Sequence, residues 1–412
     1  MSKALHIVYA PNPTGSGHNM RALAIAAQVR VQRPDVRQTV ILSSLQDTFG
    51  PMFKSAGVEV LDASPQQVTN TAQRGHLPTK LDWEGMVTGY LVPTFLNGER
   101  VLSLLGHFRD LGADLIVSDY NPTACLAARF ADLPYVLVTE RFNFSLVNVT
   151  NQQLLAGGSE INPEELDRAR AALNQVFQSI MKTAAAVITD KPAFQNFPMD
   201  DEFCELLSNG SAHFVGPMIR PLPSGDPQIN GAVVRRELGL GQGPLVVATV
   251  GGTTMHMKNK QALINCYLET YRLLRERHPY LEMVLIGREK IDTPPGVHSF
   301  DYIPDWMGLI QDSAVLLVPP GWITVTEICA LGLPAIFTLS SFSEYHEIEP
   351  FQRLIELGFL TQLGTDALEL SAKADRLISS KTYLEELRDK YRAVAPDAHG
   401  ASRAARIIIS HL

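Results

Sequence analysis

The sequence predicts an α/β protein with two domains in tandem, each built on a parallel sheet. Short apolar runs alternate with segments of helical periodicity, beginning with "ALHIVYA", residues 20–31 and "RQTVILSS". Strands that are joined by helices in this way pair in parallel. The alternation is interrupted near residue 215 by "VGPMIRPLPSGDPQING" and then restarts. A stretch so rich in proline and glycine indicates a linker, and 412 residues are enough for two hydrophobic cores.

The first half of the chain is expected to contain strands at "ALHIVYA", "RQTVILSS", "GVEVLDA", "DLIVSD", "PYVLVTE" and "AAVITD". Helices are expected at 20–31, "LLGHFRDLGA", "PTACLAARFADL" and 163–183. Residues 65–100 form a long irregular segment that is rich in aromatic and polar residues. Two interpretations stay open for it: a lid over a small amphipathic ligand, or a surface excursion with two short helices.

The second half repeats the same alternation. We expect strands at "PLVVATV", "LEMVLIG", "AVLLVPP" and "PAIFTL". The helices between them are expected at 261–278, "DWMGLIQDS", "ITVTEICALGL" and "IEPFQRLIELG", with terminal helices at 382–394 and 400–411.

Composition narrows the class of protein. The net charge of −8 argues against broad nucleic-acid binding, which needs a basic surface. The cysteines are scattered and none lies in a CxxC pair, so we expect no zinc site and no disulfide framework; they are Cys125, Cys204, Cys266 and Cys329. No apolar run approaches the roughly 18 residues of a membrane span, and the first one is too short for a signal peptide. We therefore expect a soluble, cytoplasmic protein without a metal ion or an integral membrane segment.

Ligands of open parallel sheets bind at the carboxyl ends of the strands, so the loops there carry the functional information. "GSGH" follows the first strand, and His18 would lie at that edge as a proton acceptor. Asp119 ends a buried strand at the same edge and could orient His18. The same residues also fit simpler roles: a glycine turn before a helix, and a cap for the helix after Asp119.

Two loops of the second half have features of a phosphate site. Gly251, Gly252 and Thr253 follow a strand, and their backbone amides and hydroxyl suit an anion. Gly321 precedes a helix whose first N–H groups could hold a diphosphate, while Glu327, one turn inside, could hold a ribose diol. Taken by itself, Glu327 is better explained as an acid that merely complements the helix dipole.

Taken together, these motifs resemble the GT-B glycosyltransferases, in particular the UDP-glycosyltransferase superfamily and the peptidoglycan N-acetylglucosaminyltransferase family. The resemblance spans both halves in the right order. It rests on "GSGHNMRALAIA", "ADLIVSDYNPTACLAARFADLPYV", "FVGPMIR", "FDYIPDWMGLIQDSAVLLV", "PPGWITVTEICALGLPAIF" and "SEYHEIEPFQRLIELG".

The resemblance implies a GT-B fold, in which two Rossmann-like parallel α/β domains face a central cleft. Residues 1–218 would bind the acceptor, 219–385 would bind the nucleotide sugar, and the C-terminal helices in 386–412 could cross back to the first domain. The implied activity is an inverting transfer of a sugar from an NDP-sugar, UDP or dTDP, to a hydroxyl or amine of a small molecule. No DxD triplet occurs, which fits a metal-independent transferase that needs no cofactor besides this co-substrate.

The resemblance also assigns roles to residues. His18 would be the general base and Asp119 its partner. Arg220 and the Gly321 region would approach the phosphates, Ile303 the base, Glu327 the ribose, and Glu344 and Glu347 the sugar. The full donor-binding set is Gly17, Arg220, Gly252, Thr253, Ile303, Gly321, Trp322, Ile323, Thr324, Glu327, Glu344 and Glu347.

Some positions depart from the family pattern. Glu347 stands where glutamine is usual, Pro350 replaces an asparagine, and Pro319 replaces a phosphate-binding histidine or arginine. Two rival hypotheses therefore stay open: a nucleotide-sugar 2-epimerase of the same fold, and a catalytically inactive subunit that binds a nucleotide sugar and supports a partner. The sequence does not indicate an oligomeric state.

Overall fold

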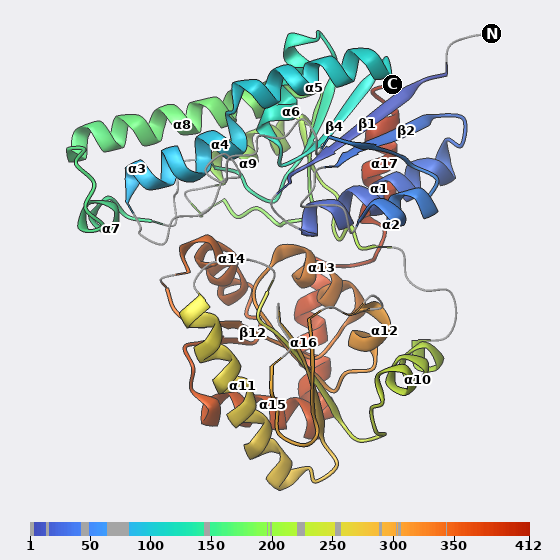
Figure 1. Ribbon diagram of the computed structural model, residues 1–412, viewed down its shortest axis with the longest axis vertical. Coiled ribbons are helices and arrows are strands. Elements are labelled where there is room, and N and C mark those ends of the chain that lie inside the picture. The colour runs from blue at the N-terminus through green and yellow to red at the C-terminus, as the bar shows by residue number, and fades with distance from the viewer. Residues whose placement is uncertain are drawn as a thin grey trace. The chain divides into compact units, whose positions relative to one another are not determined.

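The computed structural model describes residues 4–13, 16–42, 49–63, 82–143, 149–195, 197, 200–220, 227–251, 257–287, 291–301, 303, 306–342 and 344–412. Contacts divide the chain into two units. Unit 1 comprises Met1–Arg220 together with Ala398–Leu412, and unit 2 comprises Pro221–Asp397. Each unit is built around its own parallel sheet, as the sequence predicts (Figure 1).

The sheet of unit 1 has the strand order β3-β2-β1-β4-β5-β6-β7, and all its pairs are parallel. The strands are β1 (His6–Pro11), β2 (Arg37–Leu42), β3 (Glu59–Asp62), β4 (Leu115–Asp119), β5 (Tyr135–Val138), β6 (Ala186–Thr189) and β7 (Ala212–Phe214). The chain first adds strands on one side of β1 and then returns to add them on the other. The order therefore reverses between β1 and β4, which is where open α/β sheets bind ligands.

Helices cover both faces of this sheet (Figure 1). One face buries a core of strand residues against α5, α6 and α8, and α1 packs beside α17 on the other. The helices of unit 1 are α1 (Ser16–Gln32), α2 (Gly50–Ser55), α3 (Trp83–Met86), η4 (Val87–Leu91), α4 (Val92–Phe95), α5 (Gly98–Leu111), α6 (Pro122–Phe130), α7 (Asn151–Ala156), α8 (Pro163–Thr183), α9 (Asp201–Ser208) and α17 (Gly400–Ile409).

Local chemistry explains where these helices begin. Both α6 and α8 start on a proline, whose missing N–H and fixed φ suit the first helical position. The preceding asparagine caps each of them: Asn121 accepts from the N–H of Ala124, and Asn162 from that of Glu165. The cap residue and the proline stand directly before the apolar helix pattern, so the sequence could reveal both starts.

The structure describes only the later part of the segment 65–100, for which one of the two open interpretations expects short helices. Residues 83–95 are helical and contain a π-turn, in which the N–H of Val92 donates to the carbonyl of Val87. Pro93 follows at once, and its backbone has no N–H that could donate to the carbonyl four residues earlier. The wider π-turn before Pro93 therefore allows the helix to continue through the proline. Residues 64–81 lie outside the described residues.

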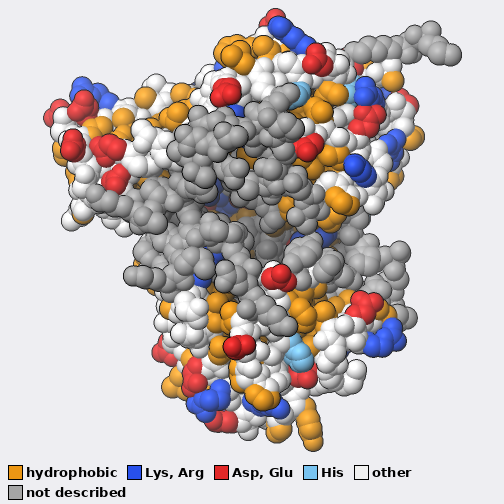
Figure 2. Space-filling view, in the orientation of Figure 1, with side chains coloured by type: hydrophobic (Ala, Val, Ile, Leu, Met, Phe, Trp, Pro, Cys, Tyr) orange, Lys and Arg blue, Asp and Glu red, His pale blue; other side chains and the backbone are white. Residues whose placement is uncertain are grey.

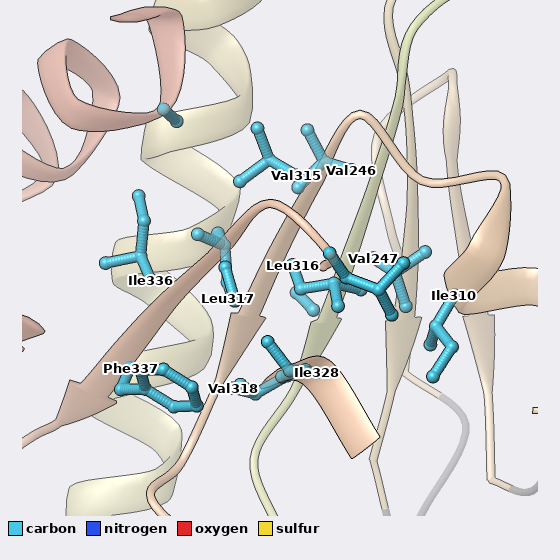
Figure 3. Packing of buried hydrophobic residues seen from close by; sticks show 14 of the residues in the cluster. Val246, Val247, Ile310, Val315, Leu316, Leu317, Val318, Ile328, Ile336 and Phe337 are labelled. Carbon is cyan, nitrogen blue, oxygen red and sulfur yellow. The ribbon is translucent and has the colours of Figure 1, made fainter. Parts of the chain in front are cut away.

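Unit 2 has a six-stranded sheet in the order β10-β9-β8-β11-β12-β13, again with parallel pairs. The strands are β8 (Leu245–Thr249), β9 (Glu282–Ile286), β10 (Val297–Phe300), β11 (Val315–Val318), β12 (Ala335–Leu339) and β13 (Thr361–Leu363). The central strands are buried on both faces, and Figure 3 shows their Val, Leu and Ile side chains interdigitating. The order reverses between β8 and β11, so unit 2 has its own switch point, the place at which open α/β sheets generally bind ligands.

The helices of unit 2 are α10 (Pro227–Leu238), α11 (Met257–Arg277), α12 (Trp306–Gln311), α13 (Trp322–Leu331), α14 (Tyr345–Glu356), α15 (Ala367–Ser379) and α16 (Lys381–Val394). In Figure 1, α11 lies beside α15 and α10 beside α12. One difference from the sequence prediction concerns the linker. Its last residues belong to α10, which begins on Pro227.

The surface carries charges of both signs. On the face drawn in Figure 2, basic and acidic side chains are interspersed over the described part of each unit. Within the described residues, the structure contains no helix with the length and apolar character needed to cross a membrane.

The last helix of the chain is held tightly in unit 1. Gln32 on α1 donates to the backbone and the hydroxyl of Ser402, both at 3.1 Å, and Arg403 donates to the carbonyl of Val215 at 2.7 Å. Gly400 begins α17 against the backbone: a Cβ at this position would come closer than 3.0 Å to the carbonyl oxygens of Gly216 and Pro217. Glycine is therefore required here by close approach.

Replacing Gly400 with alanine should destabilise unit 1 by about 1–3 kcal/mol, because the backbone of 216–217 has to shift. Chemical denaturation followed by circular dichroism would measure this. Gly98 is the matched control, since it also begins a helix and has open space around its would-be Cβ. Gly98→Ala should be neutral or add about 0.4–1 kcal/mol. Equal effects of the two substitutions would contradict the close approach of Gly400 to the backbone of 216–217.

Candidate functional site

Three acids follow three adjacent strands of unit 1. Asp119 is the last residue of β4, and Glu140 and Asp190 lie just beyond β5 and β6. Because these strands are parallel neighbours, their carboxyl ends bring the three carboxylates to one edge of the sheet. The start of α1 supplies the opposing groups, His18 and Arg21, which are one turn apart and share a face of the helix.

His18 and Asp119 form the pair that the sequence predicts. The ring nitrogen Nδ1 of His18 lies 2.7 Å from Oδ1 of Asp119. Asp119 is 2% exposed, whereas the His18 side chain is 13% exposed. A carboxylate can only accept, so the contact fits donation from an Nδ1–H. The other ring nitrogen, Nε2, then carries the lone pair, as a general base requires.

Arg21 binds the same carboxylate. Its Nε donates to Oδ2 of Asp119 at 2.8 Å, and its Nη2 donates to Oδ1 at 2.6 Å. The side chain is completely buried, and Nη1 reaches Glu140 at 3.1 Å and Asp190 at 3.5 Å. One guanidinium therefore serves as the counter-ion of all three acids, which is what a buried arginine needs.

The surroundings of Glu140 and Asp190 shift the pKa values of these two acids in opposite directions. Burial by itself would raise the pKa of Glu140, but Arg21, His18, Arg141 and Lys191 outweigh it and lower the pKa to about 2. Glu140 is therefore ionised at neutral pH. Burial raises the pKa of Asp190 to about 7; Arg21 opposes this rise, and Glu140 and Asp119 add to it. Neither oxygen of Asp190 has a hydrogen-bond partner within the described residues.

The backbone around Asp119 is also fixed. The N–H of Asn12 donates to the carbonyl of Asp119 at 2.9 Å, and its side-chain amide donates to the carbonyl of Tyr120 at 2.7 Å. Tyr120 has a left-handed backbone with φ of 44°, a conformation that costs a non-glycine residue energy. Its ring stacks on His18 with centroids 6.0 Å apart and meets Phe95 edge-on at 5.3 Å. This strained turn therefore places an aromatic floor beneath the imidazole.

The switch point of unit 2 has a glycine on each side. Gly251 follows β8 with φ of 77°, and a Cβ there would meet Pro319 at 3.1 Å. Gly321 caps α13 after β11, and the space next to its would-be Cβ is open. The N-cap of α13 makes no side-chain hydrogen bond, and helix N-termini of this kind are common anion sites. Gly252 and Thr253 lie outside the described residues.

The structure places the other predicted donor-binding residues as follows. On α13, Ile323 and Thr324 are half-buried in the first turn, while Trp322 and Glu327 are buried, Glu327 completely. Ile303 belongs to the hydrophobic core. Glu344 is the buried N-cap residue of α14 and accepts from the Ser340 hydroxyl, with Glu347 half-buried one turn later. In unit 1, Gly17 and Arg220 are half-buried. The structure thus brings Gly321 together with the predicted residues of α13. Glu344 and Glu347 belong to a different element, at the start of α14.

Sequence reasoning missed Arg21, Glu140 and Asp190. A signal for the acids was present, because each of three successive buried runs ends in an acid: "LIVSD", "VLVTE" and "VITD". Arg21 had no such signal, since an arginine on an otherwise apolar helix is usually solvated. Among the described residues, no group of three or more His, Cys, Asp or Glu could hold a metal ion.

The raised pKa of Asp190 predicts a pH-dependent cost in stability. In the unfolded chain this carboxyl ionises near pH 4, whereas in the folded protein it stays protonated until about pH 7. The folded state therefore holds more protons between these values, and its stability falls as the pH rises. Asp190→Asn should match the parent protein near pH 4 and exceed it at pH 8, by on the order of 1–3 kcal/mol.

Urea denaturation at pH 4 and pH 8 would measure this difference. Exposed Asp110→Asn is the control, and it should leave the pH dependence unchanged. A parent protein that gains stability over Asp190→Asn between pH 4 and pH 8 would contradict the assigned direction of the shift.

Comparison with known proteins shows the fold. No protein-family model matches the chain, and no curated protein matches it in sequence. Solved structures do match over nearly their whole length. The kitacinnamycin glycotransferase is 16% identical with a TM-score of 0.64, and each chain is covered to 100%. Glycosyltransferase VinC in complex with dTDP is 14% identical with a TM-score of 0.58, at 99% coverage of each chain.

A third match is a putative UDP-N-acetylglucosamine 2-epimerase from Listeria monocytogenes. It is 13% identical with a TM-score of 0.61, and 100% of this chain and 97% of that chain are covered. At such identities the likeness concerns the path of the backbone. Two units with parallel sheets, matched from end to end, show that the chain has the GT-B fold of the glycosyltransferases, as its motifs predict.

Proposed function

We propose that the protein is an inverting, metal-independent glycosyltransferase that moves a sugar from an NDP-sugar to a hydroxyl or amine of a small molecule. The observation that carries this proposal is the contact between His18 and Asp119 at the switch point of unit 1. A partly exposed imidazole on a buried carboxylate is the arrangement of a general base and its orienting acid. The GT-B fold raises the expectation that this base serves glycosyl transfer.

In this mechanism, Nε2 of His18 takes the proton of the acceptor O–H or N–H. The acceptor atom forms its bond to the anomeric carbon while the bond from that carbon to the diphosphate breaks, with inversion. The imidazolium that forms is stabilised by Asp119 at 2.7 Å. Glu140, which is ionised at neutral pH, adds a second negative charge near the ring, since His18 is among the charges that lower its pKa.

Unit 2 would bind the donor at its own switch point. The start of α13 has no side-chain cap, so its backbone N–H groups and the positive end of the helix dipole would both favour a diphosphate. As the bond to the sugar breaks, negative charge grows on the diphosphate, and these groups would stabilise it. Gly321 leaves open space where a phosphate would approach the backbone. A UDP or dTDP donor is our preferred class; the dTDP complex of VinC supports it.

Replacing His18 with alanine should lower the turnover of glycosyl transfer by about 10²–10⁴-fold and leave the affinity for the nucleotide sugar unchanged, because only the base is lost. Product formation by mass spectrometry and donor binding by calorimetry would measure the two effects. His278 offers a matched control, since its Nε2 lies 2.8 Å from Asp375 in unit 2, at the far end of α11. His278→Ala should keep full turnover. A His18→Ala protein with unchanged turnover would exclude His18 as the base.

The donor site can be tested at Gly321. An aspartate here enters open space, so it should spare the fold, but its charge would repel a diphosphate. Gly321→Asp should weaken donor binding about tenfold or more, ~1.4 kcal/mol. Gly50→Asp is the control, because it adds the same charge at the start of a helix in unit 1 where space is also open. Equal donor affinity of the two variants would place the diphosphate elsewhere.

A nucleotide-sugar 2-epimerase is the second candidate, and the match to the putative Listeria epimerase is the observation that favours it. An epimerase changes its nucleotide sugar without any acceptor. Incubating the protein with NDP-sugars alone and analysing the sugar by NMR separates the two: an isomerised sugar would support the epimerase, and an unchanged sugar that binds selectively would support the transferase.

A further inference from the structure

The Asp119 carboxylate is held by two residues. Among the described residues, His18 contacts one of its oxygens, and Arg21 contacts both. The two N–H groups of Arg21 that face Asp119 form a planar fork, and a fork on both oxygens fixes the rotation of the carboxylate plane. A single donor would leave that rotation open. The direction in which Asp119 presents Oδ1 to His18 is therefore set by Arg21.

The same fork bears on the tautomer of His18. Nη2 of Arg21 lies 3.2 Å from Nδ1 of His18 but 2.6 Å from Oδ1 of Asp119. A guanidinium has only donors, so its N–H is best directed at the oxygen. Oδ1 then faces Nδ1 at 2.7 Å, and an Nδ1 without a proton would set two lone pairs against each other. The arrangement keeps the proton on Nδ1 and the lone pair on Nε2.

A cation next to a base would normally oppose the positive charge that the base acquires. Here the chain compensates it. Nη1 of Arg21 contacts Glu140, whose carboxylate is ionised at neutral pH, and Asp190 lies on the same side at 3.5 Å. The negative charge of Glu140 therefore lies against the guanidinium and offsets the positive charge of Arg21. Arg21 can thus orient Asp119 while its own positive charge is compensated by a neighbouring carboxylate.

We propose that Arg21 is a positioning residue for the His18–Asp119 pair: it holds the Asp119 carboxylate in one plane and thereby keeps Nε2 of His18 as the basic nitrogen. This role rests on the proposed function of His18 as the general base. The Arg21 side chain is completely buried, so it would act through Asp119 and not by contact with a ligand.

Arg21→Lys tests the proposal, because lysine keeps the charge but loses the planar fork. We expect turnover to fall about 10²-fold, as for a misplaced catalytic group, with the KM of donor and acceptor little changed. The ¹⁵N resonances of His18, assigned with His18→Ala, should change from one Nδ1–H tautomer to a mixture. Arg235→Lys is the matched control: this buried arginine pairs with Asp312 in unit 2, and its loss should affect stability alone.

Wild-type turnover, or a reduced turnover with an unchanged tautomer, in folded Arg21→Lys would overturn the proposal. If Arg21→Lys does not fold, the charge-balanced double variant Arg21→Gln, Glu140→Gln takes its place under the same criteria. The ¹⁵N measurement needs no substrate. A protein that transfers no sugar would refute the proposed function, while the His18 tautomer would still show whether Arg21 fixes it.

Discussion

The parallel pairing of β1 with β4 is the constraint on which the site of unit 1 depends. The two strands are far apart in sequence, yet their register sets Pro11 opposite Asp119. That register places the turn after β1, and with it the start of α1, directly above the end of β4. Every contact of the His18–Asp119–Arg21 cluster follows from it. A shift by one residue would turn Asp119 to the other face of the sheet.

The sheet of unit 2 also reverses its strand order, but the loops at that point have a different chemical character. Its reversal of strand order between β8 and β11 again leaves two loops side by side, but these loops carry glycines where unit 1 carries charged side chains. Gly251 needs its left-handed backbone, and Gly321 leaves room at the helix start. One unit therefore presents side chains that can move a proton, and the other presents backbone groups that suit an anion. A single architecture accommodates both roles because the loops, not the strands, differ.

Much of this could be read from the sequence, for a physical reason. Strands buried on both faces, such as β5 and β11, consist almost entirely of apolar residues, and this makes them visible as short apolar runs. Their order along the chain then places His18 and Asp119 at one edge. The sequence analysis did not predict the strands β7, β10 and β13, because they are short and partly exposed. The continuous helix through Pro93 was not predicted, because proline ordinarily ends a helix.

The charged cluster could be predicted only in part. An acid after a buried strand is visible as a pattern, but which cation neutralises it depends on contacts between residues about a hundred positions apart. Arg21 becomes buried only when α1 packs on the assembled sheet. The local sequence pattern of α1 therefore does not predict its burial. The donor-side roles of Glu327, Glu344 and Glu347 remain predictions from the resemblance.

The position of α17 has a consequence for synthesis on the ribosome. Unit 1 begins at the first residue but includes Ala398–Leu412, and α17 packs on α1. Its core therefore stays incomplete until α17 has been synthesised. All residues of unit 2, by contrast, have been made before α17 emerges. Unit 1 is thus begun before unit 2 but completed after it, and until α17 emerges α1 keeps an apolar flank uncovered that a chaperone could occupy.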